Sequence, residues 1–138
     1  SNVNAKSNKE VGEFFPWTLI YDVNNNVVIE NWGKGWRLPT RKEFQELIEE
    51  CSWEYDSNEN GFWVQGKNGN NIFLPAGGHK YNDNVSTGGA SYWTSTLYEQ
   101  YSNGAFSVSI YEDYSYDWEA YKASFKFLVR PVLDNNLN

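Results

Sequence analysis

Two residue types that commonly perform chemistry occur once each in this chain, as Cys51 and His79. Cys51 ends an apolar helical stripe, where a thiol serves more often as a small buried hydrophobe than as a nucleophile. A single cysteine forms no intrachain disulfide and leaves a zinc site without a second thiolate. His79 follows Gly77-Gly78 in an expected loop, and no nucleophile neighbours it in the sequence. Both residues argue against an enzyme, and no cofactor is expected.

Carboxylates near the C-terminal end form a second group with chemical potential: Glu112, Asp113, Asp117 and Glu119. Carboxylate oxygens are ligands that calcium prefers, and calcium takes about six to eight oxygens from a defined loop. The spacing matches no familiar calcium loop, and an acidic run is more often simply solvated. A calcium site therefore stays an alternative, and no metal ligand is assigned.

Aromatic residues crowd the same region, since six of the ten tyrosines fall between positions 98 and 121 and Trp118 lies among them. In 105–110, alternation predicts a strand with an apolar core face and with Ser107 and Ser109 facing outward. From 111 to 121 the pattern has no clean period, so not all of its aromatic side chains can be buried. Aromatics mixed with Ser and Asp are typical of binding surfaces.

We therefore predict a ligand-binding face in this Tyr-rich region. A simpler interpretation is that the tyrosines only cover a sheet edge, which the carboxylates keep soluble. The binding interpretation is preferred, and it expects substantial exposure on one face for Tyr111, Tyr116, Trp118 and Tyr121. The full set of candidate ligand-binding residues is Tyr98, Tyr101, Ser107, Ser109, Tyr111, Asp113, Tyr116, Asp117, Trp118 and Tyr121.

Among the elements that must support this face, the one with the strongest sequence signal is a helix beginning after Thr40. Thr40 is a typical N-cap, and Glu43 completes a capping box. Apolar residues then recur at i, i+3, i+4 and i+7 and form one face, made of Phe44, Leu47, Ile48 and Cys51.

Short strands account for most of the remaining chain. Apolar runs at 14–23 and 27–29 flank three asparagines and predict a first hairpin. A second hairpin is predicted at 62–64 and 72–74, around Asn68-Gly69. A loop follows at 75–90, and later strands are predicted at 92–96, 105–110 and 125–129. One early helix followed by many strands predicts an α+β domain dominated by antiparallel sheet.

Chain length limits the number of domains, and net charge limits the kinds of partner. The 138 residues fit one domain, expected at 11–133, with a disordered or vector-derived lead at 1–10 and a flexible tail at 134–138. The formal net charge of −7 repels phosphate backbones, so no nucleic acid is expected as a partner. No apolar run approaches the length of a membrane span, and the polar first ten residues do not resemble a signal peptide.

Ordered motifs carry a family resemblance. They are Gly35-Trp36-Arg37-Leu38-Pro39-Thr40 with Glu43-Phe44, then Asn68-Gly69 with Ile72-Phe73-Leu74-Pro75-Ala76-Gly77, then Tyr92-Trp93-Thr94-Ser95-Thr96, and finally Val129-Arg130-Pro131-Val132. Together they resemble the Fibrobacter succinogenes major paralogous domain family over residues 11–132. The chain departs from the family's usual Arg and Gly before the last motif, at Ala123 and Lys126.

The resemblance implies a C-type-lectin-like fold in a secreted or surface-anchored bacterial protein. It implies a non-enzymatic module that binds a glycan or protein on a host or neighbouring cell. Some relatives are variable proteins of diversity-generating retroelements, whose adenine-directed substitutions yield Tyr, Ser, Asp, Asn or Phe. Glu112, Trp118, Glu119 and Lys122 do not fit that code. Binding is therefore better supported than programmed variation.

Two other functions remain open at this stage. The domain could be a structural module that contacts other subunits of a surface assembly. The related fold also hosts formylglycine formation through paired cysteines, which a lone Cys51 cannot supply.

The acidic spacing predicts that folding does not require calcium. Calcium titrated into chelator-treated protein should give no saturable micromolar heat and no rise in melting temperature. Saturable binding with a raised melting temperature would show that the carboxylates form a site after all.

Overall fold

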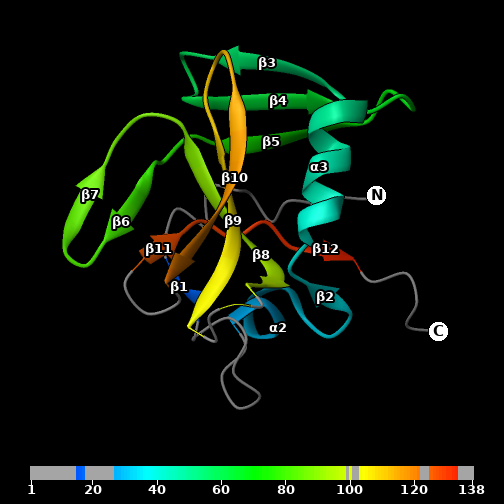
Figure 1. Ribbon diagram of the computed structural model, residues 1–138. Coiled ribbons are helices and arrows are strands. Elements are labelled where there is room, and N and C mark those ends of the chain that lie inside the picture. Colours follow the sequence, from blue (N-terminus) through cyan, green and yellow to red (C-terminus); the bar gives the residue numbers. More distant parts are fainter. Residues whose placement is uncertain (1–14, 18–26, 99, 101–102, 122–124, 134–138) are drawn as a thin grey trace.

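The computed structural model describes residues 15–17, 27–98, 100, 103–121 and 125–133, which form an α+β fold of mostly antiparallel strands (Figure 1). Neither helix in these ranges is long and apolar enough to cross a membrane. The elements in chain order are β1 (Phe15–Pro16), α2 (Val27–Trp32), β2 (Trp36–Arg37), α3 (Arg41–Glu50), β3 (Ser52–Asp56), β4 (Gly61–Gln65), β5 (Asn71–Pro75), β6 (His79–Tyr81), β7 (Asn84–Ser86), β8 (Ala90–Leu97), β9 (Gly104–Ile110), β10 (Ser115–Tyr121), β11 (Phe125–Phe127) and β12 (Val132–Leu133).

A three-stranded sheet with the order β10-β9-β8 lies at the centre of the fold. Strand β9 is the middle strand and pairs antiparallel with both neighbours. Helix α3 and the sheet β3-β4-β5 lie toward one face of this central sheet, while α2, β1 and β11 lie toward the other (Figure 1). The middle strand β9 is therefore covered on both faces.

The first core cluster joins α3 and the sheet β3-β4-β5 to the central sheet. Phe44 of α3 contacts Tyr92 of β8, with 6.0 Å between the ring centroids. The Tyr92 hydroxyl donates to the carbonyl of Pro75 at 2.8 Å, and burial raises the pKa of this phenol. The buried members of the cluster are Phe44, Phe62, Val64, Leu74, Ala76, Ala90, Tyr92, Val108, Ile110 and Leu128.

The second core cluster fills the opposite face of the central sheet. Trp93 contacts Phe127 of β11 with 4.3 Å between ring centroids, and both side chains are fully buried. The indole of Trp17 donates to the Thr94 carbonyl at 3.0 Å, which fastens the N-terminal segment to β8. The buried members are Trp17, Val28, Leu38, Trp93, Ala105, Ala120, Phe127 and Val129.

Helix α3 begins where the capping box predicts. The Glu43 amide donates to Thr40 Oγ1 at 3.1 Å, and the Thr40 amide donates to Glu43 Oε1 at 2.9 Å. Arg37 donates to the same carboxylate at 2.6 Å, which lowers the pKa of Glu43. The predicted apolar face is confirmed, since Phe44 is buried and Leu47, Ile48 and Cys51 pack against the first core cluster.

The hairpin around Asn68-Gly69 is confirmed as β4 and β5, and Gly69 has the positive φ of 83° that this turn requires. The closing motif is also placed structurally: β12 pairs with β2, so the two motif segments around Arg37 and Arg130 lie together. Arg130 is buried at 5% exposure, and desolvation lowers its pKa to about 10.

Two sequence predictions about local structure are wrong. Residues 27–29 are not the second strand of a hairpin, because Val27–Trp32 is helix α2, whose Val28 and Trp32 pack into the second core cluster at helical spacing. A three-residue apolar run fits a strand and a helix equally well. Here the helix is formed, and it buries Val28 in the second core cluster with Trp32 packed against that cluster. The expected loop at 75–90 contains the hairpin β6-β7, so His79 lies in a strand rather than in a loop.

Several predictions fall outside the described residues. These are the lead at 1–10, the tail at 134–138 and most of the expected strand at 14–23, of which β1 is described.

Replacing Thr40 by Ala removes the side-chain acceptor of the Glu43 amide in the first turn of α3, so we expect the free energy of unfolding to fall by about 1 kcal/mol. Urea unfolding measures the change. Thr87→Ala, an exposed threonine outside any helix, serves as the matched control. Equal midpoints for the two variants would show that the cap contributes nothing.

Candidate ligand-binding site

The central strand of the predicted face is not exposed. Ser107 and Ser109 are 0% and 1% exposed, so the prediction that they face outward is wrong. Alternation correctly separated two faces of β9, but both faces are buried because β9 is the middle strand between the two core clusters. Small hydroxyl side chains fit there since Ser109 Oγ lies 2.8 Å from Ser91 Oγ and Ser107 donates to the Trp118 carbonyl at 3.0 Å.

Trp118 is a packing residue rather than an exposed anchor. Its indole donates to Ser109 Oγ at 2.9 Å. Its ring makes edge contacts with Phe125 and Phe127, at centroid distances of 5.0 Å and 5.4 Å. The prediction of substantial exposure is therefore wrong for Trp118, which is half-buried against the second core cluster.

Asp117 also has a structural partner. It forms an ion pair with Arg41 of α3, and Gln45 donates to the same carboxylate oxygen at 3.3 Å. The Arg41 guanidinium lies 4.0 Å from the ring centre of Phe106 on β9. Asp117 thus ties β10 to α3, which leaves it poorly placed to serve a ligand.

The remaining outer candidates are scattered. Tyr98 is half-buried and makes an edge contact with Phe106, with 5.7 Å between centroids. Tyr101 and the side chain of Tyr121 lie outside the described residues.

Three tyrosines at the turn between β9 and β10 form a stack. The ring planes of Tyr111 and Tyr114 are 21° apart with centroids at 4.8 Å, and Tyr116 lies within 6.2 Å of both at angles under 15°. Tyr114 is 60% exposed and Tyr116 is 46% exposed, so the expected exposure is confirmed for Tyr116. The same prediction is wrong for Tyr111, which is half-buried. A hydrogen bond with Tyr116, aided by burial, raises the pKa of Tyr111 to about 12.

Backbone geometry holds this tyrosine stack in place. The Tyr111 amide donates to the Tyr114 carbonyl at 2.7 Å, which closes the turn. Gly89 has a φ of +70°, and a Cβ at that position would lie 2.7 Å from the ring of Tyr111. The Tyr111 ring therefore rests against backbone that only glycine leaves open.

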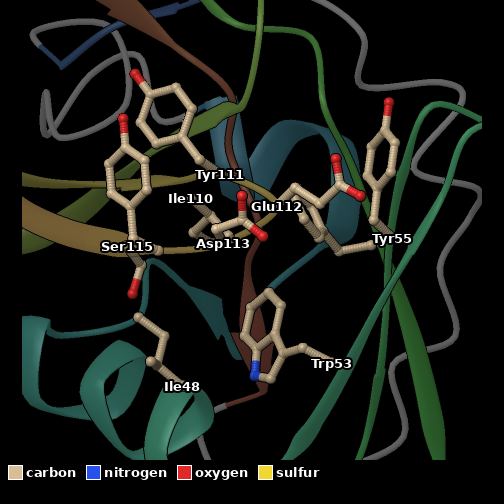
Figure 2. Close-up of a pocket in the computed structure, with 10 residues that line it drawn as sticks. Ile48, Trp53, Tyr55, Ile110, Tyr111, Glu112, Asp113 and Ser115 are labelled. Carbon is tan, nitrogen blue, oxygen red and sulfur yellow. The ribbon is translucent and has the colours of Figure 1, made fainter.

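The stack borders a hollow of about 190 Å³ between the β9-β10 turn, helix α3 and the sheet β3-β4-β5 (Figure 2). Figure 2 shows Glu112 and Asp113 between Tyr111 on one side and Tyr55 on the other, with Trp53 below them. The lining residues are Ile48, Trp53, Tyr55, Phe62, Ile110, Tyr111, Glu112, Asp113, Tyr114 and Ser115.

Sequence reasoning missed the wall that β3 contributes. Trp53 donates from its indole to the Leu47 carbonyl at 3.0 Å, and Tyr55 donates to Asn60 Oδ1 at 3.1 Å, so both rings are fixed. Both also pack on Phe62, with centroids at 6.0 Å and 5.3 Å. A signal existed, since the aromatics of Ser52–Asp56 alternate with polar residues as in a half-buried strand.

Aromatic walls and exposed carboxylates make the hollow suited to a particular chemistry. Ring faces attract cations and the apolar faces of sugars, and carboxylates accept hydrogen bonds from ammonium, guanidinium or hydroxyl groups. Of the four carboxylates weighed as calcium ligands, Asp117 is already paired with Arg41. Among the described residues, no group of three or more metal-ligating side chains is close enough to hold an ion.

The different roles of two aromatics on the β9-β10 hairpin can be separated by truncation. Trp118→Ala removes a half-buried ring together with its hydrogen bond to Ser109, and we expect it to cost about 3 kcal/mol of stability. Tyr114→Ala removes a mostly exposed ring and should change stability by less than about 0.5 kcal/mol. Chemical denaturation of both variants decides the matter, and comparable losses would contradict the assignment of Tyr114 to the surface.

Comparison with models of protein families, with curated proteins and with solved structures finds no match to this chain. The resemblance to the Fibrobacter succinogenes major paralogous domain family therefore rests on the sequence motifs alone. The geometry of the hollow and of the residues around it is the basis for the function proposed for this chain.

Proposed function

We propose that this chain is a non-enzymatic ligand-binding or adhesion domain, exported to the surface of a bacterial cell. The ordered motifs support a C-type-lectin-like fold, and the α+β architecture with mostly antiparallel strands is compatible with it. In this proposal the ligand is a glycan or a protein on a host or neighbouring cell, and it engages the hollow beside the tyrosine stack.

The observation that carries the proposal is the tyrosine stack itself. Tyr114 and Tyr116 expose about half of their surfaces to solvent, whereas other large aromatics of this fold, such as Trp93, are fully buried in the core. Aromatic rings held rigidly at a surface lose little entropy on binding, and such rings are frequent hot spots. Glu112 and Asp113 beside them supply polar acceptors that fix orientation.

The size of the hollow indicates how a ligand engages it. Pockets for whole small molecules usually hold about 300–1,000 Å³. The hollow holds only about 190 Å³, which suits one projecting group of a larger ligand, such as a side chain or a single sugar unit. A macromolecular ligand would then cover the surrounding tyrosines as well.

An array of glycans and extracellular proteins probed with the purified domain tests the proposal. Tyr114→Ala should weaken binding to any hit by about 2 kcal/mol, roughly thirtyfold, because a hot-spot ring is lost. Tyr81→Ala is the matched control, since Tyr81 is 43% exposed but does not line the hollow.

Three outcomes would contradict the proposal. Unchanged affinity in Tyr114→Ala would place the ligand elsewhere. Exclusive binding to copies of the chain itself would indicate a subunit-contact module of a surface assembly. Turnover of a bound compound would indicate an enzyme.

A further inference from the structure

The outer face of the sheet β3-β4-β5 carries an exposed tryptophan. Alternation along β4 sends Phe62 and Val64 into the first core cluster, where they are 3% and 1% exposed. The same alternation turns Trp63 outward, and it remains 42% exposed. This face lies on the side of the sheet opposite the first hollow, which Phe62 lines.

Trp63 is held in one orientation. Its indole donates to Asp56 Oδ2 at 3.0 Å, and its ring lies 4.9 Å from that of Phe73 on the next strand. Asp56 is fixed in turn by the amides of Asn58 and Glu59, at 3.0 Å and 3.1 Å. A ring restrained by two neighbours, Asp56 and Phe73, presents its free face at little entropic cost.

Hydrogen-bonding side chains stand beside this ring in an ordered row. Strand register places Ser52, Gln65 and Asn71 directly across from one another on the three strands. The next row on the same face contains Glu54, Trp63 and Phe73. Successive rows on one face of a sheet are about 7 Å apart, so a polar row adjoins an aromatic row.

The polar row, together with Glu54, Trp63 and Trp53, lines a second, open hollow of about 440 Å³, within the usual range of pockets for small ligands. Its lining combines two indoles with two amides, a hydroxyl and a carboxylate. The lining residues are Ser52, Trp53, Glu54, Trp63, Gln65 and Asn71.

We propose that this second hollow binds a pyranose ring of a glycan, stacked on Trp63 with its hydroxyls toward the polar row. A sugar ring has one face of C–H groups that suits an aromatic plane, and a rim of hydroxyls that both donate and accept. Gln65 and Asn71 supply donors and acceptors together, and Glu54 supplies an acceptor beside the ring. The site is separate from the tyrosine stack and goes beyond the function proposed for it.

Other occupants fit this chemistry less well. A cation would be drawn by paired carboxylates, but the Asp56 oxygens already accept from Trp63 and from two backbone amides. An apolar protein surface would bury the side-chain amide of Asn71 and the amide oxygen of Gln65 without giving them hydrogen-bond partners, which is costly. A sugar satisfies both the ring and the amides.

Saturation-transfer-difference NMR tests the proposal with four probes at millimolar concentration: the methyl pyranosides of glucose, galactose, mannose and N-acetylglucosamine. At least one should give saturable transfer, strongest at ring C–H protons. Trp63→Ala should weaken its binding at least tenfold. Gln65→Ala, an exposed polar substitution with little effect on folding, should weaken it severalfold.

Tyr81→Ala truncates an exposed aromatic that lines neither hollow, so this control variant should bind the same pyranoside with unchanged affinity. Melting curves confirm that each variant is folded. The proposal is overturned if none of the four probes gives saturable transfer, or if binding survives both Trp63→Ala and Gln65→Ala. It is also overturned if Tyr114→Ala alone abolishes binding, since the sugar would then occupy the first hollow.

Discussion

Strand β9 is buried on both faces, and the packing on its two sides determines where aromatic side chains remain exposed. Val108 and Ile110 belong to the first core cluster, while Ala105 belongs to the second. The only polar side chains this strand can bury are ones whose hydrogen bonds are satisfied locally, as those of Ser107 and Ser109 are. With the strand filled in this way, exposed aromatics are left to the turn that follows it, where the tyrosine stack forms.

Local chemistry made part of this fold predictable from the sequence. The capping box at Thr40 and the Asn68-Gly69 turn are decided by residues within a few positions of each other, and both were found. The burial of Ser107 and Ser109 was not predictable, because alternation reports that two faces differ but not that both are covered. That depends on β8 and β10, which are assembled by tertiary packing.

One side of the candidate site was predictable from the sequence and the other was not, again because local sequence does not report tertiary packing. The crowding of aromatics at Tyr111, Tyr114 and Tyr116 is visible in the sequence, because it exceeds what one strand can bury. The opposing wall of Trp53 and Tyr55 comes from a strand far away in the chain, and only the packing of two sheets brings it to the turn. Trp118 shows the opposite error. The aromatic-rich composition predicted an exposed binding residue, but Trp118 is half-buried against Ser109 and two phenylalanines.

One sheet, β3-β4-β5, serves both hollows, and its construction explains how they can act separately. The inner face reaches the first hollow through Tyr55 and Phe62, whereas the outer face presents Trp63. Trp53 lines both hollows, but its indole is anchored to the Leu47 carbonyl, so a ligand on one face has little freedom to shift it. Coupling between two sites requires an element with two arrangements, and a pinned ring does not provide one. The two faces should therefore bind independently, and a ligand that reaches both would gain affinity through linkage alone.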